Sequence, residues 1–78
     1  MWKVYALKSK DRNYIYVGLT EDLDRRIAEH NSGKNKTTKP YKPFKLIYSE
    51  EFQTRMEARI KEKNLKSGSG KEFLKKIK

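Results

Sequence analysis

The chain has 78 residues, which is room for one small domain with a modest hydrophobic core. It contains no cysteine, which excludes disulfide bonds and cysteine-based zinc sites and is typical of a reducing compartment, and its apolar runs are too short to span a bilayer. From this length, the absence of cysteine and the short apolar runs we expect a single cytoplasmic domain over residues 1–78 that binds no membrane. Because 20 lysines and arginines oppose 10 acidic residues, for a formal net charge of +10, we expect its partner to be a polyanion.

Residues 2–8 and 14–18 are rich in aromatic and β-branched residues and are separated by a short polar segment. This pattern predicts two antiparallel strands joined by a hairpin loop. If the residues at the ends of the loop pair, Tyr5 lies opposite Gly18, and Tyr16 is its diagonal neighbour on the same face of the sheet. Taken alone, the two tyrosines are also typical of strand packing, and the glycine is also typical of a turn.

Residues 22–32 are predicted to form a helix with Asp22 as its N-cap and a stop near Gly33. Its inward face, counted at helical spacing from the first leucine, carries Arg26 and His30. Packing alone favours leucine or alanine at such positions. Arginine suits phosphate and histidine transfers protons near neutral pH, although an arginine paired with an acid and a histidine with satisfied hydrogen bonds are the alternatives.

Residues 34–43 contain two prolines and several lysines, which predicts a loop. Residues 44–52 have the composition of a third strand. Thr54 is followed three residues later by Glu57, a capping box that should start a second helix ending near Lys66.

Gly68 is the expected stop of that second helix, and Ser69 with Glu72 forms a further capping box. A short last helix is therefore predicted, and its apolar residues are Phe73, Leu74 and Ile77. The order of elements is ββαβαα. It predicts an α+β fold in which helices pack on a small, mainly antiparallel sheet of three strands.

The excess positive charge is confined to two segments. Residues 34–45 hold five lysines and no acidic residue, and residues 61–78 hold seven lysines and two glutamates. Basic and acidic residues balance elsewhere, so the charge indicates a surface for nucleic acid, with a merely soluble lysine-rich exterior as the alternative.

Glu62 is one of those two glutamates and lies between Ala58 and Leu65 at helical spacing, so it should partly face inward. A single carboxylate of this kind can hold Mg²⁺, whose other sites are filled by water and substrate phosphate. The alternative is a surface ion pair with Arg59 or Lys66.

Together these features resemble the GIY-YIG nuclease superfamily over about residues 2–76. The matching motifs fall on Lys3-Val4-Tyr5, Tyr16-Val17-Gly18, Arg26, His30 and Glu62. Lysine replaces the glycine of the first motif, and Leu19 follows the second motif where relatives often carry lysine. The chain is most similar to small stand-alone bacterial members related to the amino-terminal domain of the excinuclease C subunit.

This resemblance implies a divalent-metal-dependent endonuclease that hydrolyses phosphodiester bonds in DNA, or in RNA, during repair, recombination or nucleic-acid processing. Glu62 would bind one Mg²⁺ or Mn²⁺, and Arg26 would stabilise charge on the phosphate. Tyr5 is the favoured general base, with Tyr16 positioning water or phosphate and His30 as proton relay, although the roles of the two tyrosines stay open.

The charged segments would hold the nucleic-acid backbone beside this site, and an aromatic side chain among the lysines could stack on an unpaired base. The residues expected to do so are Lys34, Lys36, Lys39, Tyr41, Lys42, Lys45, Lys66 and Lys71. Two alternatives stay open: a nucleic-acid-binding module that kept the fold without turnover, and an interaction domain whose charge serves only solubility.

Overall fold

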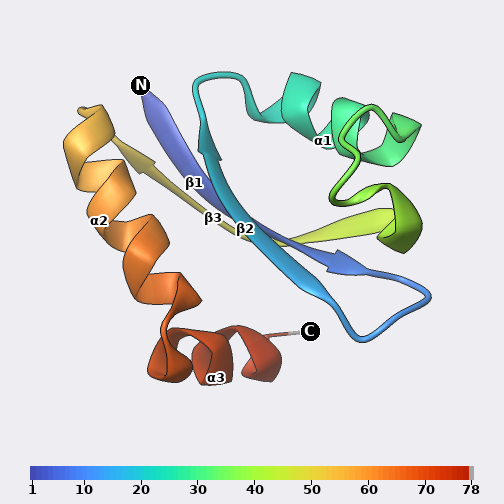
Figure 1. Cartoon of the computed structure of the whole chain (residues 1–78). Helices are drawn as coiled ribbons and strands as arrows, with labels where there is room; N and C mark the ends of the chain where they lie inside the picture. Colours follow the sequence, from blue (N-terminus) through green and yellow to red (C-terminus); the bar gives the residue numbers. More distant parts are fainter. Residues whose placement is uncertain (78) are drawn as a thin grey trace.

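The computed structural model of the chain describes residues 1–77 and contains three strands, three α-helices and a 3₁₀ turn (Figure 1). In chain order they are β1 (Trp2–Ser9), β2 (Ile15–Thr20), α1 (Leu23–Ser32), η1 (Lys39–Tyr41), β3 (Phe44–Phe52), α2 (Arg55–Lys66) and α3 (Gly68–Lys76). The predicted ββαβαα order and α+β class are confirmed. Within residues 1–77, each helix is too short or too polar to traverse a lipid bilayer.

The three strands form an antiparallel sheet in the order β2-β1-β3, so β1 is central and β2 is an edge strand. The predicted hairpin register is confirmed, because Tyr5 pairs with Gly18 and the Ser9 amide donates to the Tyr14 carbonyl at 2.9 Å. The pairing of β1 with β3 contains a bulge that leaves Ile47 without a partner on β1.

Side chains alternate between the two faces of the sheet, and each face has its own helical cover (Figure 1). On one face, Tyr5 and Leu7 pack with apolar residues of α1; we call this the α1 face. On the other, Val4 and Ala6 pack with α2 and α3; we call this the α2–α3 face. Leu65 belongs to that second cluster, and burying a leucine of this kind contributes roughly 1.5–3 kcal/mol.

The local signals for α1 and α2 are confirmed at the residues that carry them. Asp22 caps α1 by accepting from the Arg25 amide, and Gly33 ends it with a positive φ of 83°, which favours glycine. Thr54 caps α2 by accepting from the Glu57 amide at 3.2 Å. Both helices therefore begin where a short polar side chain satisfies a free backbone donor.

The predicted end of α2 near Lys66 is confirmed, whereas the predicted stop at Gly68 and the predicted cap at Ser69 are wrong. Ser67 ends α2 and also caps α3, because its hydroxyl accepts from the Gly70 amide; Gly68 is the first residue of α3, and Ser69 is not a cap. The reason is tertiary. A Cβ on Gly70 would overlap the Asn64 carbonyl oxygen and lie 2.5 Å from Leu65 Cα, so this glycine allows α3 to turn back closely on α2.

Candidate active site

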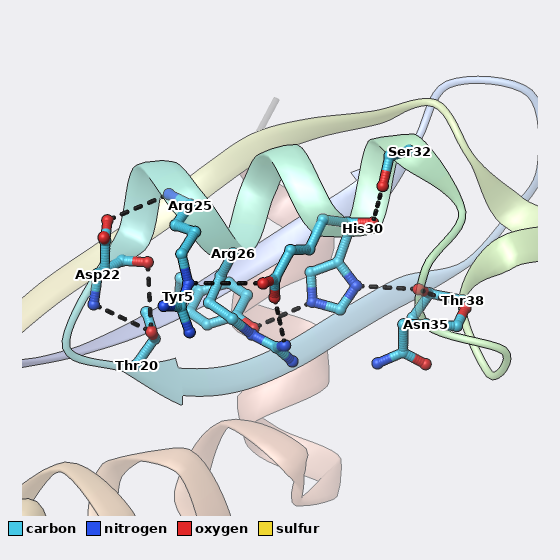
Figure 2. Close-up of polar contacts among 10 residues, drawn as sticks. Tyr5, Thr20, Asp22, Arg25, Arg26, His30, Ser32, Asn35 and Thr38 are labelled. Atoms are coloured by element: carbon cyan, nitrogen blue, oxygen red, sulfur yellow. Dashed lines mark hydrogen bonds and ion pairs between the residues drawn. The ribbon is translucent and has the colours of Figure 1, made fainter.

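A hydrogen-bonded chain starts at Tyr5 in the middle of β1 and runs across α1 into the following loop (Figure 2). The Tyr5 hydroxyl lies 3.1 Å from His30 Nε2, and His30 Nδ1 lies 2.9 Å from the Thr38 hydroxyl. Thr38 in turn donates to the Asn35 carbonyl at 3.5 Å. Tyr5, His30 and Thr38 are each 0% exposed, so the chain is closed off from water.

The contact between the Thr38 hydroxyl and the Asn35 carbonyl indicates which group donates in each hydrogen bond of this series. Because the Thr38 hydroxyl donates to a carbonyl, its lone pairs are free to accept the Nδ1 proton of His30. Nε2 then carries a lone pair and accepts the proton of the Tyr5 hydroxyl. With the Thr38 hydroxyl as donor to that carbonyl, the matching histidine tautomer is the one that can receive a proton from Tyr5.

Burial keeps both partners neutral. It raises the pKa of Tyr5 by more than the neighbouring Arg26 side chain lowers it. Burial and the Arg26 charge together lower the pKa of His30 from its ordinary 6.5. At neutral pH the contact is thus between a neutral phenol and a neutral imidazole.

Tyr16 and Gly18 of β2 complete this part of the site. The Tyr16 ring lies 6.2 Å from the Tyr5 ring and 4.7 Å from His30, measured between centroids, and Tyr16 is half-exposed. A Cβ on Gly18 would stand 2.8 Å from the Tyr5 hydroxyl oxygen and 3.0 Å from Tyr16 Cε2. Gly18 lies inside β2, so its role is to leave room for the two phenol rings.

Arg26 is half-buried on α1, beside Tyr5 (Figure 2). Its Nη1 lies 2.9 Å from Glu29 Oε1, one turn further along the helix, which fixes the guanidinium at one end. Its charge interacts with both Tyr5 and Tyr16. The arrangement leaves a planar cation at the site, suited to phosphate oxygens.

Glu62 comes from α2 and is 8% exposed. Its carboxylate lies 3.3 Å from Lys66 Nζ and 3.7 Å from Arg59 Nη1, so it makes both of the ion pairs considered from the sequence. Its negative charge adds, as the smallest contribution, to the effect of burial in raising the pKa of Tyr5.

The oxygen donors suit a hard cation that takes only one carboxylate ligand from the protein. Residues 1–77 hold no cluster of three or more acidic, histidine or cysteine side chains. Glu62 nevertheless offers two carboxylate oxygens, and Lys66, its ion-pair partner, lines the same groove as Tyr16. Mg²⁺ commonly uses one carboxylate with water and phosphate oxygens.

The predicted nucleic-acid residues fall into three places. Lys34, Lys36, Lys39 and Lys42 lie on the loop between α1 and β3. Tyr41 belongs to the same loop, but its ring is stacked on Tyr14 at 3.9 Å between centroids and 10° between planes, so one of its faces is already covered.

Lys45 points away from that loop. It pairs with Lys8 across the sheet and therefore lies on the α2–α3 face. Lys66 and Lys71 instead line a groove of about 580 Å³ that also contains Tyr16. Of the predicted lysines, these two thus lie beside a candidate catalytic residue.

Sequence reasoning missed Thr38, the residue that fixes His30. The two are eight residues apart, with a helix end and a loop between them, so no strand or helix periodicity relates them. Asn31 is a similar case, since its side chain accepts from the Phe44 amide at 2.6 Å and ties α1 to the start of β3.

Known proteins share these features. A family model described as the GIY-YIG catalytic domain matches residues 1–78. A UPF0213 protein of Staphylococcus haemolyticus is 43% identical over 75 residues, which are 95% of this chain and 90% of that protein. The UPF0213 protein YazA of Bacillus subtilis is 46% identical over 55 residues, or 69% of this chain and 54% of that protein. The solution NMR structure of a UPF0213 protein from Bacillus halodurans has 41% sequence identity and a TM-score of 0.56, covering 95% of this chain and 82% of that chain. The chain therefore belongs to the GIY-YIG family.

Proposed function

We propose that the protein is a divalent-metal-dependent nuclease that hydrolyses phosphodiester bonds in DNA or RNA. The observation that carries this proposal is the convergence of Tyr5, Tyr16, Arg26 and His30 on one face of the sheet, around the space left by Gly18. Packing alone does not require a buried tyrosine–histidine hydrogen bond beside a half-buried arginine, and perturbed titratable groups concentrate at functional sites.

The two tyrosines differ in what can reach them. Tyr5 has no exposed surface, whereas Tyr16 is only half-buried and lines the groove with Lys66. Burial therefore favours the opposite assignment to the one expected from the sequence: Tyr16 contacts the attacking water, and in its deprotonated form it accepts the proton of that water and becomes the neutral phenol. Tyr5 and His30 then form the rigid support behind Tyr16, and the Arg26 cation interacts with the Tyr16 oxygen.

Arg26 is the group suited to the phosphate. Its guanidinium can donate two parallel hydrogen bonds to phosphate oxygens, and the contact with Glu29 orients it before substrate arrives. Charge that grows on the phosphate in the transition state would be stabilised by a donor already in position.

Glu62 is the residue that would hold the metal ion. When bound, a divalent ion supplies Lewis-acid stabilisation of the phosphate and of the leaving oxygen. Lys66 and Arg59 contact the same carboxylate, so Glu62 must exchange at least part of these ion pairs for the ion.

The test is cleavage of labelled single-stranded, duplex and branched DNA, and of RNA, with Mg²⁺ or Mn²⁺. We expect cleavage by the wild type and loss of it in Glu62→Gln and in Tyr16→Phe. The matched control is Glu72→Gln, which removes an exposed acid from the same basic segment. Equal cleavage by all four proteins would point to a contaminant and refute the site.

A non-catalytic nucleic-acid-binding module is the second candidate, and the ion pairs of Glu62 are what favour it, because they satisfy the carboxylate without a metal. This candidate predicts salt-dependent binding of nucleic acid by the wild type and no cleavage with either ion.

A further inference from the structure

A second groove, of about 810 Å³, lies at the end of β1 that enters the hairpin loop. Its apolar part is formed by Phe44 and Ile47. Most of its other lining residues are exposed lysines, and no acidic residue lines it; the lysines are Lys8, Lys10, Lys45 and Lys75. We call it the distal lysine groove.

Two of these lysines lie next to each other although their positive charges repel. Lys8 and Lys45 are register partners on β1 and β3, so their side chains leave the same face of the sheet next to each other. Like charges directly opposite in a sheet are destabilising. None of the ion pairs found among residues 1–77 includes a lysine of this groove. A bound anion would relieve the repulsion.

The distal lysine groove is joined to the candidate active site through Lys75. This residue lines both the distal groove and the groove along β2 that contains Tyr16. Lys66 and Lys71 line the β2 groove as well, so lysines continue from Tyr16 past α3 to Lys8 and Lys45. Figure 1 shows α3 lying below the sheet, between α2 and the hairpin end.

We propose that these two connected grooves form one path for the nucleic-acid strand that flanks the scissile phosphate, with the distal lysine groove holding backbone phosphates several nucleotides from the cut. This proposal rests on the proposed function for the position of the cut. The path lies along β2 and the α2–α3 face, on the far side of the sheet from the lysines of the loop between α1 and β3.

The chemistry of the grooves favours a nucleic-acid strand over a single small anion. Cations recur along both grooves, as phosphates recur along a strand, and half-buried apolar or aromatic side chains lie between them: Tyr14 and Ile15 in one groove, Ile47 in the other. Basic grooves interleaved with such surfaces bind single strands through phosphate contacts and base stacking.

The test is binding without cleavage, measured by fluorescence anisotropy in metal-free buffer over a series of salt concentrations. Two oligothymidylate probes are used, of about 4 and about 16 nucleotides, which bracket ordinary single-strand site sizes. The double variant Lys8→Gln with Lys45→Gln is compared with Lys63→Gln with Lys76→Gln, whose exposed lysines line neither groove and whose net charge is the same.

We expect the groove variant to bind the long probe less tightly, with a log–log salt slope reduced by about 1.4, since each lost contact with a single strand removes about 0.7. Binding of the short probe should not separate the two double variants. The thermal midpoint of the groove variant should be no lower than that of the wild type, because the substitutions remove a repulsive pair.

An equal change of slope in the two double variants would show a net-charge effect and overturn the path, and so would an unchanged slope in the groove variant. Binding to phosphatidylserine vesicles that depends on Lys8 and Lys45, with no such dependence for the long probe, would overturn it in favour of a lipid surface. Failure of the proposed function is distinguishable from failure of the path. If the groove variant loses binding as expected but the wild type cleaves no substrate, the path stands and the proposed nuclease function is refuted.

Discussion

The substitution Thr38→Val tests the buried series of hydrogen bonds that runs from Tyr5 through His30 to Thr38. Thr38 is the residue whose hydroxyl determines which His30 nitrogen carries the proton. Valine keeps the shape of threonine and removes only the hydroxyl, which is the sole partner of His30 Nδ1 within the described part of the chain. At a site with 0% exposure, water cannot replace it. A buried donor left unpaired costs about 1–3 kcal/mol.

The imidazole can escape this cost in one way, by moving its proton from Nδ1 to Nε2. Nε2 then stops accepting from the Tyr5 hydroxyl, and the loss is transferred to a phenol that is equally buried. Either outcome should lower the free energy of unfolding by about 1–3 kcal/mol, and each kcal/mol lowers the melting temperature by about 4–8 °C in a domain of this size.

Three measurements check this reasoning. Thermal unfolding gives the stability change, the ¹⁵N shifts of the His30 ring give the tautomer, and cleavage rates give the effect on the site. Thr38→Ser is the control, because it loses a methyl group worth roughly 0.8 kcal/mol and keeps the hydroxyl, so its tautomer should match the wild type. A valine variant with unchanged stability and an unchanged His30 tautomer would refute the series of hydrogen bonds from Tyr5 through His30 to Thr38.

Four further predictions follow from the structure. Gly18→Ala should lose stability and cleavage together, because the new Cβ would stand 2.8 Å from the buried Tyr5 hydroxyl oxygen; melting and rate assays check this. Gly70→Ala should lower stability by about 1–3 kcal/mol through overlap with the end of α2, whereas Gly68→Ala, which meets nothing within 4 Å, should be neutral or stabilising in the same melts. Burial lowers the pKa of His30, so below about pH 6.5 the unfolded chain binds more protons than the folded chain. The stability of the wild type should therefore fall as the pH drops below that value, and the stability of His30→Gln should fall less. Thermal melts over a pH series measure this difference. Arg26→Ala should reduce kcat by about 10²–10³ and leave nucleic-acid affinity nearly unchanged, which single-turnover and binding assays separate.

The features that could be predicted from the sequence are those that depend on residues close together in the chain. Asp22 and Thr54 are short polar side chains in front of a helix, and each caps the helix that follows. The register that pairs Tyr5 with Gly18 follows from closing a short hairpin loop, and the loop closes as expected. In each case the deciding hydrogen bond joins residues a few positions apart.

The features that could not be predicted depend on segments that meet only in the folded chain. Gly70 is a glycine because α3 passes close to the backbone of α2, and the capping pattern at Ser69 carries no information about that approach. Thr38 meets His30 because the loop after α1 folds back on it. Lys45 is an intermediate case: a core position for Phe44 implies that the next side chain points to the opposite face, and its partner Lys8 follows only from the register of β3.

The position of β2 at the edge of the sheet explains how one site draws on both helical layers. Tyr5, Tyr16, Arg26 and His30 belong to the α1 face, whereas Glu62 stands on α2, which covers the other face. If β2 were a central strand, the sheet would separate the two layers completely. At the edge, α2 packs against β1 and β2 alike, and Lys66, the ion-pair partner of Glu62, lines the groove that contains Tyr16. An open edge strand also invites pairing with another chain, and charged side chains, lysine especially, discourage it. Lys66 and Lys71 line the groove beside β2. Under the proposed function they would therefore both keep the free chain from pairing edge to edge and hold a phosphate backbone there when nucleic acid binds.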